Sequence, residues 1–419
     1  MHLLAQDVRG RRRKGMRCVR RLLGRRRPHF VMSCLTTALA CVIAIAPCSA
    51  IRSVLASPPP ASPGALSLSC EAAVLLEQET GSIVYARNAF RRMYPASITK
   101  MMTALLALER GNLEDLVTVS RTAAEEPGST MGLAAGDVFT LEDLLYGLML
   151  NSGNDAAWAI AEHVGGTAQA FFDMMNRRAR EIGAINTHFT NPHGLTDPNH
   201  YTTAFDLALI ARTCLKHPFF KRLVATKEKD VIDASEEVRI KLANTNRLLW
   251  SYLGADGVKT GTTESAGQCL VASATRDGMK LLAIVLNSGD RWSDAASLLD
   301  YGFENYRTVM IMRAGETLME VPVRGGTRSA VSAVCVQDLV ACVPRYKSGI
   351  WIDLDLPSEL RAPCQRGAII GQARVMLGQD VVGGTSLACG DWVTRKTVSG
   401  PLVRLLYSLT KRLSSLGII

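Results

Sequence analysis

Apolar residues recur along the middle of this chain with the periods of strands and helices. Two short β-prone runs, at residues 72–76 and 83–85, flank Glu79-Thr80-Gly81 and predict a hairpin. From residue 97 to 108 the apolar side chains have helical spacing, which places Ser97 at a helix N-terminus. By the same reasoning, helices are predicted at residues 141–150, 155–164, 168–182, 204–214 and 294–306, and strands around 259–261, at 269–275 and at 279–286.

The pattern of apolar and polar residues changes twice towards the C-terminus. Beyond about residue 309, short apolar runs punctuated by Gly, Pro and Arg predict a small all-β domain that ends near residue 397. In the last segment, residues 398–419, one helical face carries Leu402, Leu405, Leu406, Leu409, Leu413 and Leu416. Basic residues lie largely elsewhere on this helix, so it suits a membrane interface; the alternative is a helix docked on the protein's own core.

The net charge of +10 comes from the N-terminus alone. Residues 1–27 hold ten arginines and Lys14 against Asp7, and the rest of the chain has 37 basic and 37 acidic residues. A folded part without excess charge gives no reason to expect nucleic-acid binding. The basic stretch precedes an uncharged apolar run at residues 30–46 and then small residues, a pattern typical of an export signal. Cleavage is expected after Ala50 or Ala56, with an uncleaved anchor as the alternative.

Cysteines leave two possibilities open. Seven lie beyond the leader, and four of these, Cys335, Cys342, Cys364 and Cys389, fall in the C-terminal quarter. In an exported chain they can form disulfides, whose pairing the sequence does not choose. They can equally be buried apolar thiols. The absence of any CxxC pair argues against a metal, and nothing in the sequence implies a cofactor.

Three short motifs carry the candidate chemistry: Ser97-Ile98-Thr99-Lys100, Ser152-Gly153-Asn154 and Lys259-Thr260-Gly261. A serine hydroxyl needs a base, and lysine serves when burial or a second cation destabilises its ammonium. Lys100 has the spacing to touch Ser97. Each motif alone is a weak signal, since Ser408-Leu409-Thr410-Lys411 repeats the first by chance.

The roles follow from these residue types. Ser97 is the predicted nucleophile and Lys100 its base, with Lys259 as the second cation. Ser152 can relay a proton, and Asn154 can hydrogen-bond both Lys100 and a substrate amide. The backbone N–H groups of Ser97 and Thr262 are candidate oxyanion donors. The predicted ligands of a terminal carboxylate are Lys259, Thr260, Gly261 and Thr262.

Together with their long flanking segments, these motifs resemble those of the penicillin-binding D-alanyl-D-alanine carboxypeptidases, which are exported serine peptidases of peptidoglycan. The resemblance covers about residues 72–306 and includes Tyr94-Pro95-Ala96 before Ser97, Thr190-Asn191-Pro192-His193-Gly194-Leu195, and Asp256-Gly257-Val258 before Lys259. It implies the same roles for the motif residues, and it adds Arg291 as a further cation for the substrate carboxylate. Peptidoglycan stem peptides and β-lactam antibiotics are the implied partners.

The resemblance also implies an α+β fold, an antiparallel sheet flanked by helices with a helical subdomain. The expected organisation is an export signal or anchor (1–56), a linker (57–70), a peptidase domain (71–307), a β-rich domain (308–397) and an amphipathic membrane-association helix (398–419). The expected location is the periplasmic face of the cytoplasmic membrane.

Three rival functions are weighed against this one. A class A β-lactamase shares the motifs but needs a glutamate-bearing loop for deacylation, and the segment 188–203 offers Asp197 without a glutamate. A metallopeptidase would use His188, His193, Asp197 and His200, whose spacing is not that of a zinc helix. A wall-binding protein without turnover would have no need of Ser97, Lys100 and Lys259 together.

Overall fold

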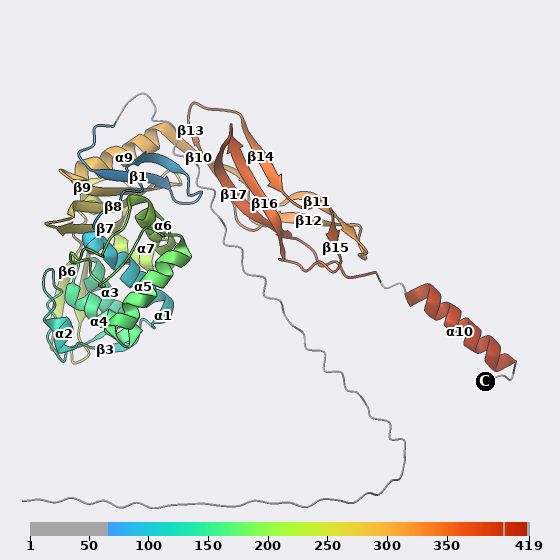
Figure 1. Cartoon of the computed structure of the whole chain (residues 1–419), viewed down its shortest axis with the longest axis horizontal. Coiled ribbons are helices and arrows are strands. Elements are labelled where there is room, and N and C mark those ends of the chain that lie inside the picture. Colours follow the sequence, from blue (N-terminus) through green and yellow to red (C-terminus); the bar gives the residue numbers. More distant parts are fainter. Residues whose placement is uncertain (1–65, 397–398, 417–419) are drawn as a thin grey trace, which may run out of the picture. The chain divides into compact units, whose positions relative to one another are not determined.

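The computed structural model describes residues 66–396 and 399–416 (Figure 1). The predicted export signal, residues 1–56, and most of the linker, 57–70, lie outside the described residues. None of the described helices is both long and apolar enough to cross a membrane.

An antiparallel five-stranded sheet forms the centre of the predicted peptidase domain. Its order is β2-β1-β9-β8-β7. The strands are β1 (Ala72–Glu77), β2 (Ile83–Arg87), β7 (Ala255–Thr263), β8 (Gly267–Arg276) and β9 (Met279–Ser288). β1 and β2 form the predicted hairpin, and β1 also pairs with β9, with Ala72 opposite Leu286.

The two faces of the sheet are covered by different helices (Figure 1). Because strand side chains alternate, Ala73 and Leu75 of β1 pack with helix α9 (Arg291–Asn305), whereas Val74 and Leu76 join the core on the other face. All six residues of β1 are buried, so its apolar run is continuous rather than alternating. α9 was predicted at 294–306; it begins earlier, at Arg291, where Asp290 caps it.

A helical region covers the second face and holds the second motif. Threonine side chains at residues 140, 167 and 203 accept backbone N–H bonds at helix starts, which explains where those helices begin. The helices are α1 (Lys100–Arg110), α2 (Arg121–Ala124), α3 (Leu141–Met149), α4 (Asn154–Gly165), α5 (Ala168–Ile182), α6 (Ala204–Cys214), α7 (Pro218–Ala225) and α8 (Leu248–Ser251). The predicted limits of α5 and α6 are confirmed, whereas α7 was missed.

Two small ribbons in this region were also missed. They pair β3 (Leu116–Thr118) with β4 (Val138–Thr140), and β5 (Glu228–Ile232) with β6 (Arg239–Ala243). Their strands alternate buried and exposed residues over only three to five positions. Such short runs give a weak period-2 signal in the sequence.

An all-β domain follows, as predicted, and its first strand directly continues from α9. Its strands are β10 (Tyr306–Met312), β11 (Thr317–Arg324), β12 (Ala330–Cys335), β13 (Leu339–Pro344), β14 (Ile350–Asp355), β15 (Leu360–Arg361), β16 (Ile369–Leu377) and β17 (Asp380–Cys389). Two small apolar clusters form its core. Helix α10 (Ser399–Ser415) ends the described chain.

The seven described cysteines are free and buried, in agreement with the alternative of apolar thiols. Burial raises the pKa of Cys70 and of Cys269 to about 11. At neutral pH these two side chains are therefore un-ionised thiols, which are poor nucleophiles.

Candidate functional site

The first motif forms a tight turn that leads into a buried helix. Ser97 lies in a 3-10 turn, Ala96–Thr99, and α1 begins at Lys100, so the prediction of a helix starting at Ser97 was early by one turn. Ser97 is half-buried, whereas Lys100 is fully buried. Lys100 Nζ donates to Ser97 Oγ (3.0 Å), Asn154 Oδ1 (2.7 Å) and the carbonyl oxygen of His193 (3.1 Å). The structure thus brings the predicted nucleophile and base into contact.

The surroundings of Lys100 favour its neutral form. Burial is the main cause of a pKa well below the usual 10.5, and the positive charge of Lys259 adds to it. The carboxylates of Asp155 and Glu126 act in the opposite direction. Loss of one proton from Nζ leaves an amine that still donates to Asn154 and His193 and lies 3.0 Å from the hydroxyl of Ser97, so Lys100 has the geometry of a general base.

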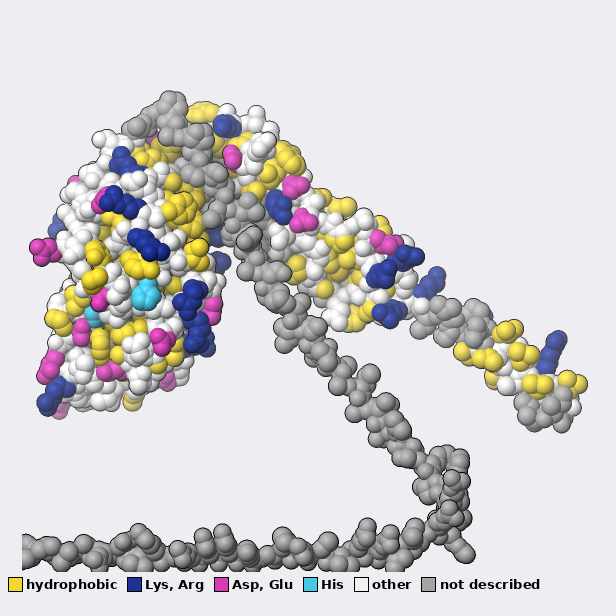
Figure 2. Space-filling view, in the orientation of Figure 1, with side chains coloured by type: hydrophobic (Ala, Val, Ile, Leu, Met, Phe, Trp, Pro, Cys, Tyr) yellow, Lys and Arg dark blue, Asp and Glu magenta, His cyan; other side chains and the backbone are white. Residues whose placement is uncertain are grey.

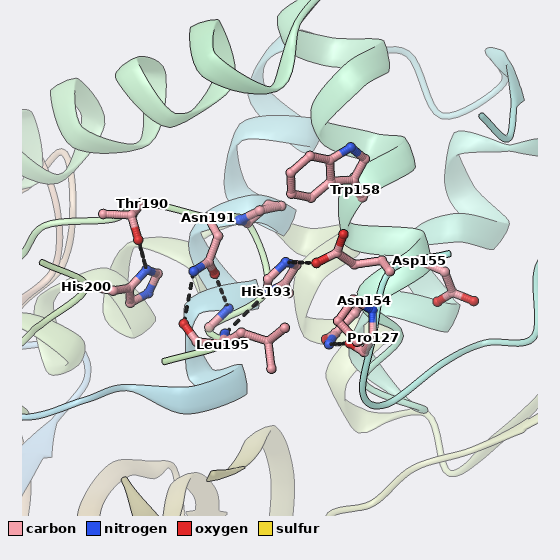
Figure 3. A network of polar contacts seen from close by, with 12 residues as sticks. Pro127, Asn154, Asp155, Trp158, Thr190, Asn191, His193, Leu195 and His200 are labelled. Carbon is pink, nitrogen blue, oxygen red and sulfur yellow. Dashed lines mark hydrogen bonds and ion pairs between the residues drawn. The ribbon is translucent and has the colours of Figure 1, made fainter. Parts of the chain in front are cut away.

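The second motif places the side chain of Asn154 against Lys100. Ser152 has a positive φ of 63°, which turns the chain sharply before α4, and its Oγ is buried without a partner among the described residues. Asn154 is the first residue of α4. Its Nδ2 donates to the carbonyl of Pro127 (Figure 3). Its Oδ1 therefore faces Lys100. The side-chain amide of Asn154 is therefore held in one orientation from both ends.

Asp155 supports this arrangement and was missed in the sequence. Its buried carboxylate accepts hydrogen bonds from the backbone N–H groups of Met131 (2.9 Å), Gly132 (3.0 Å) and Leu133 (3.1 Å). A carboxylate one residue after the motif reads as an ordinary first-turn residue of a helix. In the structure it fixes the loop at residues 130–133 against the start of α4.

His193 and Glu126 are the second group that sequence reasoning missed as part of the site. The N–H of Leu195 donates to His193 Nδ1, which leaves the ring proton on Nε2, and Nε2 lies 2.7 Å from Glu126 Oε1 (Figure 3). The ring N–H is poorly aligned with that oxygen. The ring also stacks on Trp158, with 6.0 Å between ring centres. Burial lowers the pKa of His193, so this is a neutral imidazole beside a carboxylate.

The rival metallopeptidase interpretation needs His188, His193, Asp197 and His200 to lie together. The described residues contain no group of three or more His, Cys, Asp or Glu side chains that could hold a metal ion. His200 instead hydrogen-bonds Thr99 Oγ1 (2.8 Å), and burial lowers its pKa to about 3. The carbonyl of His193, rather than its ring, contacts Lys100.

The third motif lies on β7 and packs against the nucleophile turn. A Cβ added at Gly261 would lie 3.1 Å from the backbone nitrogen of Ser97, so the strand and the turn are close enough that a larger residue would press on them. Thr260 Oγ1 shares a hydrogen bond with Thr245 Oγ1 (2.7 Å) and is buried, whereas Thr262 is exposed. The backbone of β7 therefore runs alongside Ser97.

Lys259 is the most unusual side chain of this strand. It is 1% exposed, and its Nζ has no hydrogen-bond partner among the described residues. Burial, followed by the positive charge of Arg291, lowers the pKa of Lys259 to about 7. A buried ammonium without a partner is costly, and an anionic group would offset that cost.

Arg291 joins the third motif from α9. Its Nη1 donates to the carbonyl of Gly261 (2.9 Å) and to Thr262 Oγ1 (2.8 Å), and its guanidinium stacks on Trp292. Burial lowers the pKa of Arg291, and an arginine guanidinium keeps its charge in proteins. Arg291 thus contacts β7 beside the third motif, near enough for its charge to act on Lys259.

The second SxxK sequence has no such surroundings. Ser408 lies on α10, and its Oγ donates to the carbonyl of Leu405 in the same helix. Ser408 and Lys411 are both exposed. Exposure leaves the amine of Lys411 without the burial that would make it a base.

Taken together, the site presents a serine with a buried amine as its base, and an unpaired buried cation beside it. Such an arrangement can transfer an acyl group from a substrate that carries a carboxylate near the scissile bond. Residues 58–290 match the family described as D-alanyl-D-alanine carboxypeptidase, and residues 306–395 match the C-terminal domain of penicillin-binding protein 5.

Comparison with individual proteins points to the same family. D-alanyl-D-alanine carboxypeptidase DacF of Bacillus subtilis is 34% identical over 316 residues, which are 73% of this chain and 81% of DacF. DacA of Haemophilus influenzae is 34% identical over 324 residues, 74% of this chain and 81% of DacA. The solved structure of penicillin-binding protein 5 from Haemophilus influenzae has a TM-score of 0.69 at 31% identity, and covers 80% of this chain and 100% of its own.

Proposed function

This chain belongs to the D-alanyl-D-alanine carboxypeptidase family, and from that premise we propose how its own side chains carry out the reaction. It is a serine-type D-alanyl-D-alanine carboxypeptidase, a hydrolase that removes the terminal D-alanine from peptidoglycan pentapeptide stems through an acyl-serine intermediate. β-Lactams acylate the same serine. The assignment of each residue below is our proposal.

The observation that carries these assignments is the buried ammonium of Lys259, which has no partner among the described residues. We assign it to the C-terminal carboxylate of the substrate, with Thr260 and Thr262 as hydroxyl donors, Gly261 as the backbone between them and Arg291 as a second cation. Binding of the carboxylate favours the protonated form of Lys259, so its pKa rises when substrate enters.

In the acylation step, Ser97 Oγ attacks the carbonyl carbon of the penultimate D-alanine while Lys100 Nζ accepts the hydroxyl proton. The negative charge on the carbonyl oxygen is stabilised by the backbone N–H groups of Ser97 and Thr262. The C–N bond then breaks, and the departing amine of the terminal D-alanine receives a proton by way of Ser152. Asn154 holds Lys100 in place through the 2.7 Å hydrogen bond from Nζ to Oδ1.

Hydrolysis returns the enzyme to its starting state. Water attacks the ester carbonyl, Lys100 accepts a proton from the water, and Ser97 Oγ leaves and is reprotonated. Rapid release of a β-lactam adduct needs a glutamate that activates this water. Glu126 is a nearby glutamate, but its carboxylate lies 2.7 Å from His193 Nε2. Residues 188–203, where a class A β-lactamase is expected to carry its catalytic glutamate, contain none, and this supports a peptidase rather than a β-lactamase.

We further propose that the enzyme is exported and associates with the outer face of the cytoplasmic membrane through α10. The relatives are bacterial cell-wall enzymes. Support for the membrane comes from the apolar face of α10, since Leu405 is 60% exposed and Leu406 56% exposed. An amphipathic helix with such a face lies stably in the headgroup region of a bilayer.

Labelling with a fluorescent penicillin tests the nucleophile. Ser97→Ala should abolish covalent labelling, and Ser408→Ala, which removes the serine of the chance SxxK sequence, should leave it unchanged. D-alanine released from a pentapeptide then separates a peptidase from an inert binder. Labelling that survives in Ser97→Ala, or absence of D-alanine release by the unmodified protein, would contradict the assignment.

A further inference from the structure

The all-β domain contains an open pocket with a strongly basic lining. Its volume is about 460 Å³, and it is lined by Arg324, Gly325, Arg361, Ala362, Arg395 and Lys396. All four charged residues are exposed. In Figure 2, Lys and Arg side chains gather at one end of this domain.

Backbone pairing fixes the segments that carry these charges. β11 and β15 pair in parallel, with Arg324 opposite Arg361. The N–H of Ala362 donates to the carbonyl of Arg324 (3.1 Å), and Arg395 Nε donates to the carbonyl of Ala362 (3.0 Å). The N–H of Lys396 donates to the carbonyl of Gly325 (2.8 Å), which completes the ring of segments around the pocket.

This concentration of charge is not neutralised within the described residues. Like charges directly opposite each other on paired strands are destabilising, and Arg324 faces Arg361. Other arginines of the domain have carboxylate partners: Arg328 pairs with Asp391 at 3.4 Å, and Arg374 with Asp355 at 3.1 Å. The ion pairs of the described residues include none of the four pocket cations.

The position of the pocket along the chain indicates where its ligand comes from. Lys396 precedes the first residue of α10, Ser399, by three residues, and three extended residues span at most about 11 Å. This limit holds for any orientation of the helix. If α10 lies in the headgroup region, the pocket is therefore within about a Debye length of the lipid phosphates.

We propose that this pocket binds the phosphate group of an anionic phospholipid, and so fixes the all-β domain on the bilayer surface. The proposal rests on the membrane association proposed for α10. Planar guanidinium groups match the paired oxygens of a phosphodiester, so three arginines and a lysine suit this ligand. The apolar face of α10 supplies attachment to any bilayer, and the pocket adds a preference for anionic lipid.

The test compares binding of the full chain to vesicles of phosphatidylcholine alone and of phosphatidylcholine mixed with phosphatidylglycerol. The double variant Arg324→Gln/Arg361→Gln should lose about 30-fold in affinity for the mixed vesicles, since each surface cation contributes about fivefold. Its binding to pure phosphatidylcholine should not change. Because two facing like charges are removed, its stability to urea should be unchanged or increased, which distinguishes a lost site from a folding defect.

The matched control is Arg307→Gln/Arg313→Gln, which removes the same charge from exposed arginines of β10 and the turn after it. An equal loss of vesicle affinity in both double variants, or no loss in either, would overturn the proposal that the pocket binds lipid phosphate. If the unmodified protein binds no vesicles, the membrane role of α10 fails, and a water-soluble short-chain phosphatidylglycerol then decides the pocket. If calorimetry detects binding of this lipid to the unmodified protein and not to Arg324→Gln/Arg361→Gln, the phosphate site in the pocket is supported. If it detects no binding to the unmodified protein, the proposal is overturned. Inorganic phosphate that competes as well as the short-chain lipid would show a site for free phosphate instead.

Discussion

Gly194 is the position where the fold of the site can be tested most directly. It follows His193, whose carbonyl contacts Lys100, and it has a positive φ of 96°. A Cβ added there would lie 1.8 Å from the carbonyl oxygen of Ala96, the residue before the nucleophile. We therefore predict that Gly194→Ala displaces the Ser97 turn, the loop that holds Lys100, or both.

The size of the effect follows from the contact and from a matched glycine. The Ala96 carbonyl would have to retreat by about 1.6 Å to reach an ordinary contact of 3.4 Å. Gly183 has almost the same φ, 94°, but a Cβ there meets only Leu209 Cδ1 at 3.8 Å. Gly183→Ala should therefore cost about 1–2 kcal/mol for its left-handed backbone. Gly194→Ala should cost about 1–3 kcal/mol more, because it adds a steric clash within a packed core.

Two measurements separate stability from catalysis. Urea unfolding gives the free energy of unfolding of both variants, and the rate of acylation by a fluorescent penicillin reports the geometry of Ser97. A displacement of about 1 Å at a reacting group can cost about 100-fold in rate, so Gly194→Ala should acylate about 100-fold more slowly than Gly183→Ala. Equal acylation rates in the two folded variants would refute the claim that Gly194 allows this close approach.

The remaining predictions concern charge and the second SxxK sequence. kcat/KM should fall as pH rises above about 7, because Lys259 then loses the proton that attracts the substrate carboxylate, and this alkaline limb should disappear in Lys259→Arg. On the acid side kcat/KM should also fall, as Lys100 becomes protonated and stops acting as a base. Arg291→Gln should raise KM about tenfold, because one cation for the substrate carboxylate is lost. It should also move the alkaline limb to higher pH, because the charge of Arg291 lowers the pKa of Lys259. An alkaline limb at the same pH would contradict this electrostatic coupling between Arg291 and Lys259. Asp155→Asn should lower the free energy of unfolding by about 3 kcal/mol in urea titrations, because it turns an N–H donor towards backbone N–H groups; a loss below about 1 kcal/mol would contradict this. D-alanine release should be the same in Ser408→Ala as in the unmodified protein, and any loss would restore a role for that serine.

The sequence predicted those parts of the site that depend on local spacing. Ser97 and Lys100 are three residues apart, so one turn of helical chain brings them together whatever the rest of the fold does. A strand was predicted around residues 259–261, ahead of two β-prone runs, and β7 spans Ala255–Thr263. The contact between these distant segments came from the resemblance to a known family rather than from any period in the sequence.

Long-range polar contacts could not be predicted in this way. His193 is 67 residues from Glu126 in the sequence, and no sequence motif predicts that the two residues are in contact. Asp155 acts on backbone N–H groups of residues 131–133, and backbone groups leave no trace in the side-chain pattern. Such contacts depend on tertiary packing, so only the folded chain reveals them.

The pairing of β1 with β9 limits how early in synthesis the site can assemble. Ala72 and Leu286 lie opposite each other although they are more than 200 residues apart in the sequence. Closing so long a loop is slow, and it cannot begin until the last strand of the sheet has been synthesised. During synthesis, therefore, Ser97 is carried on a chain that has not yet assembled the strand of Lys259 beside it. We therefore expect the nucleophile to stay inactive until synthesis has passed β9, which ends at Ser288 of the 419 residues.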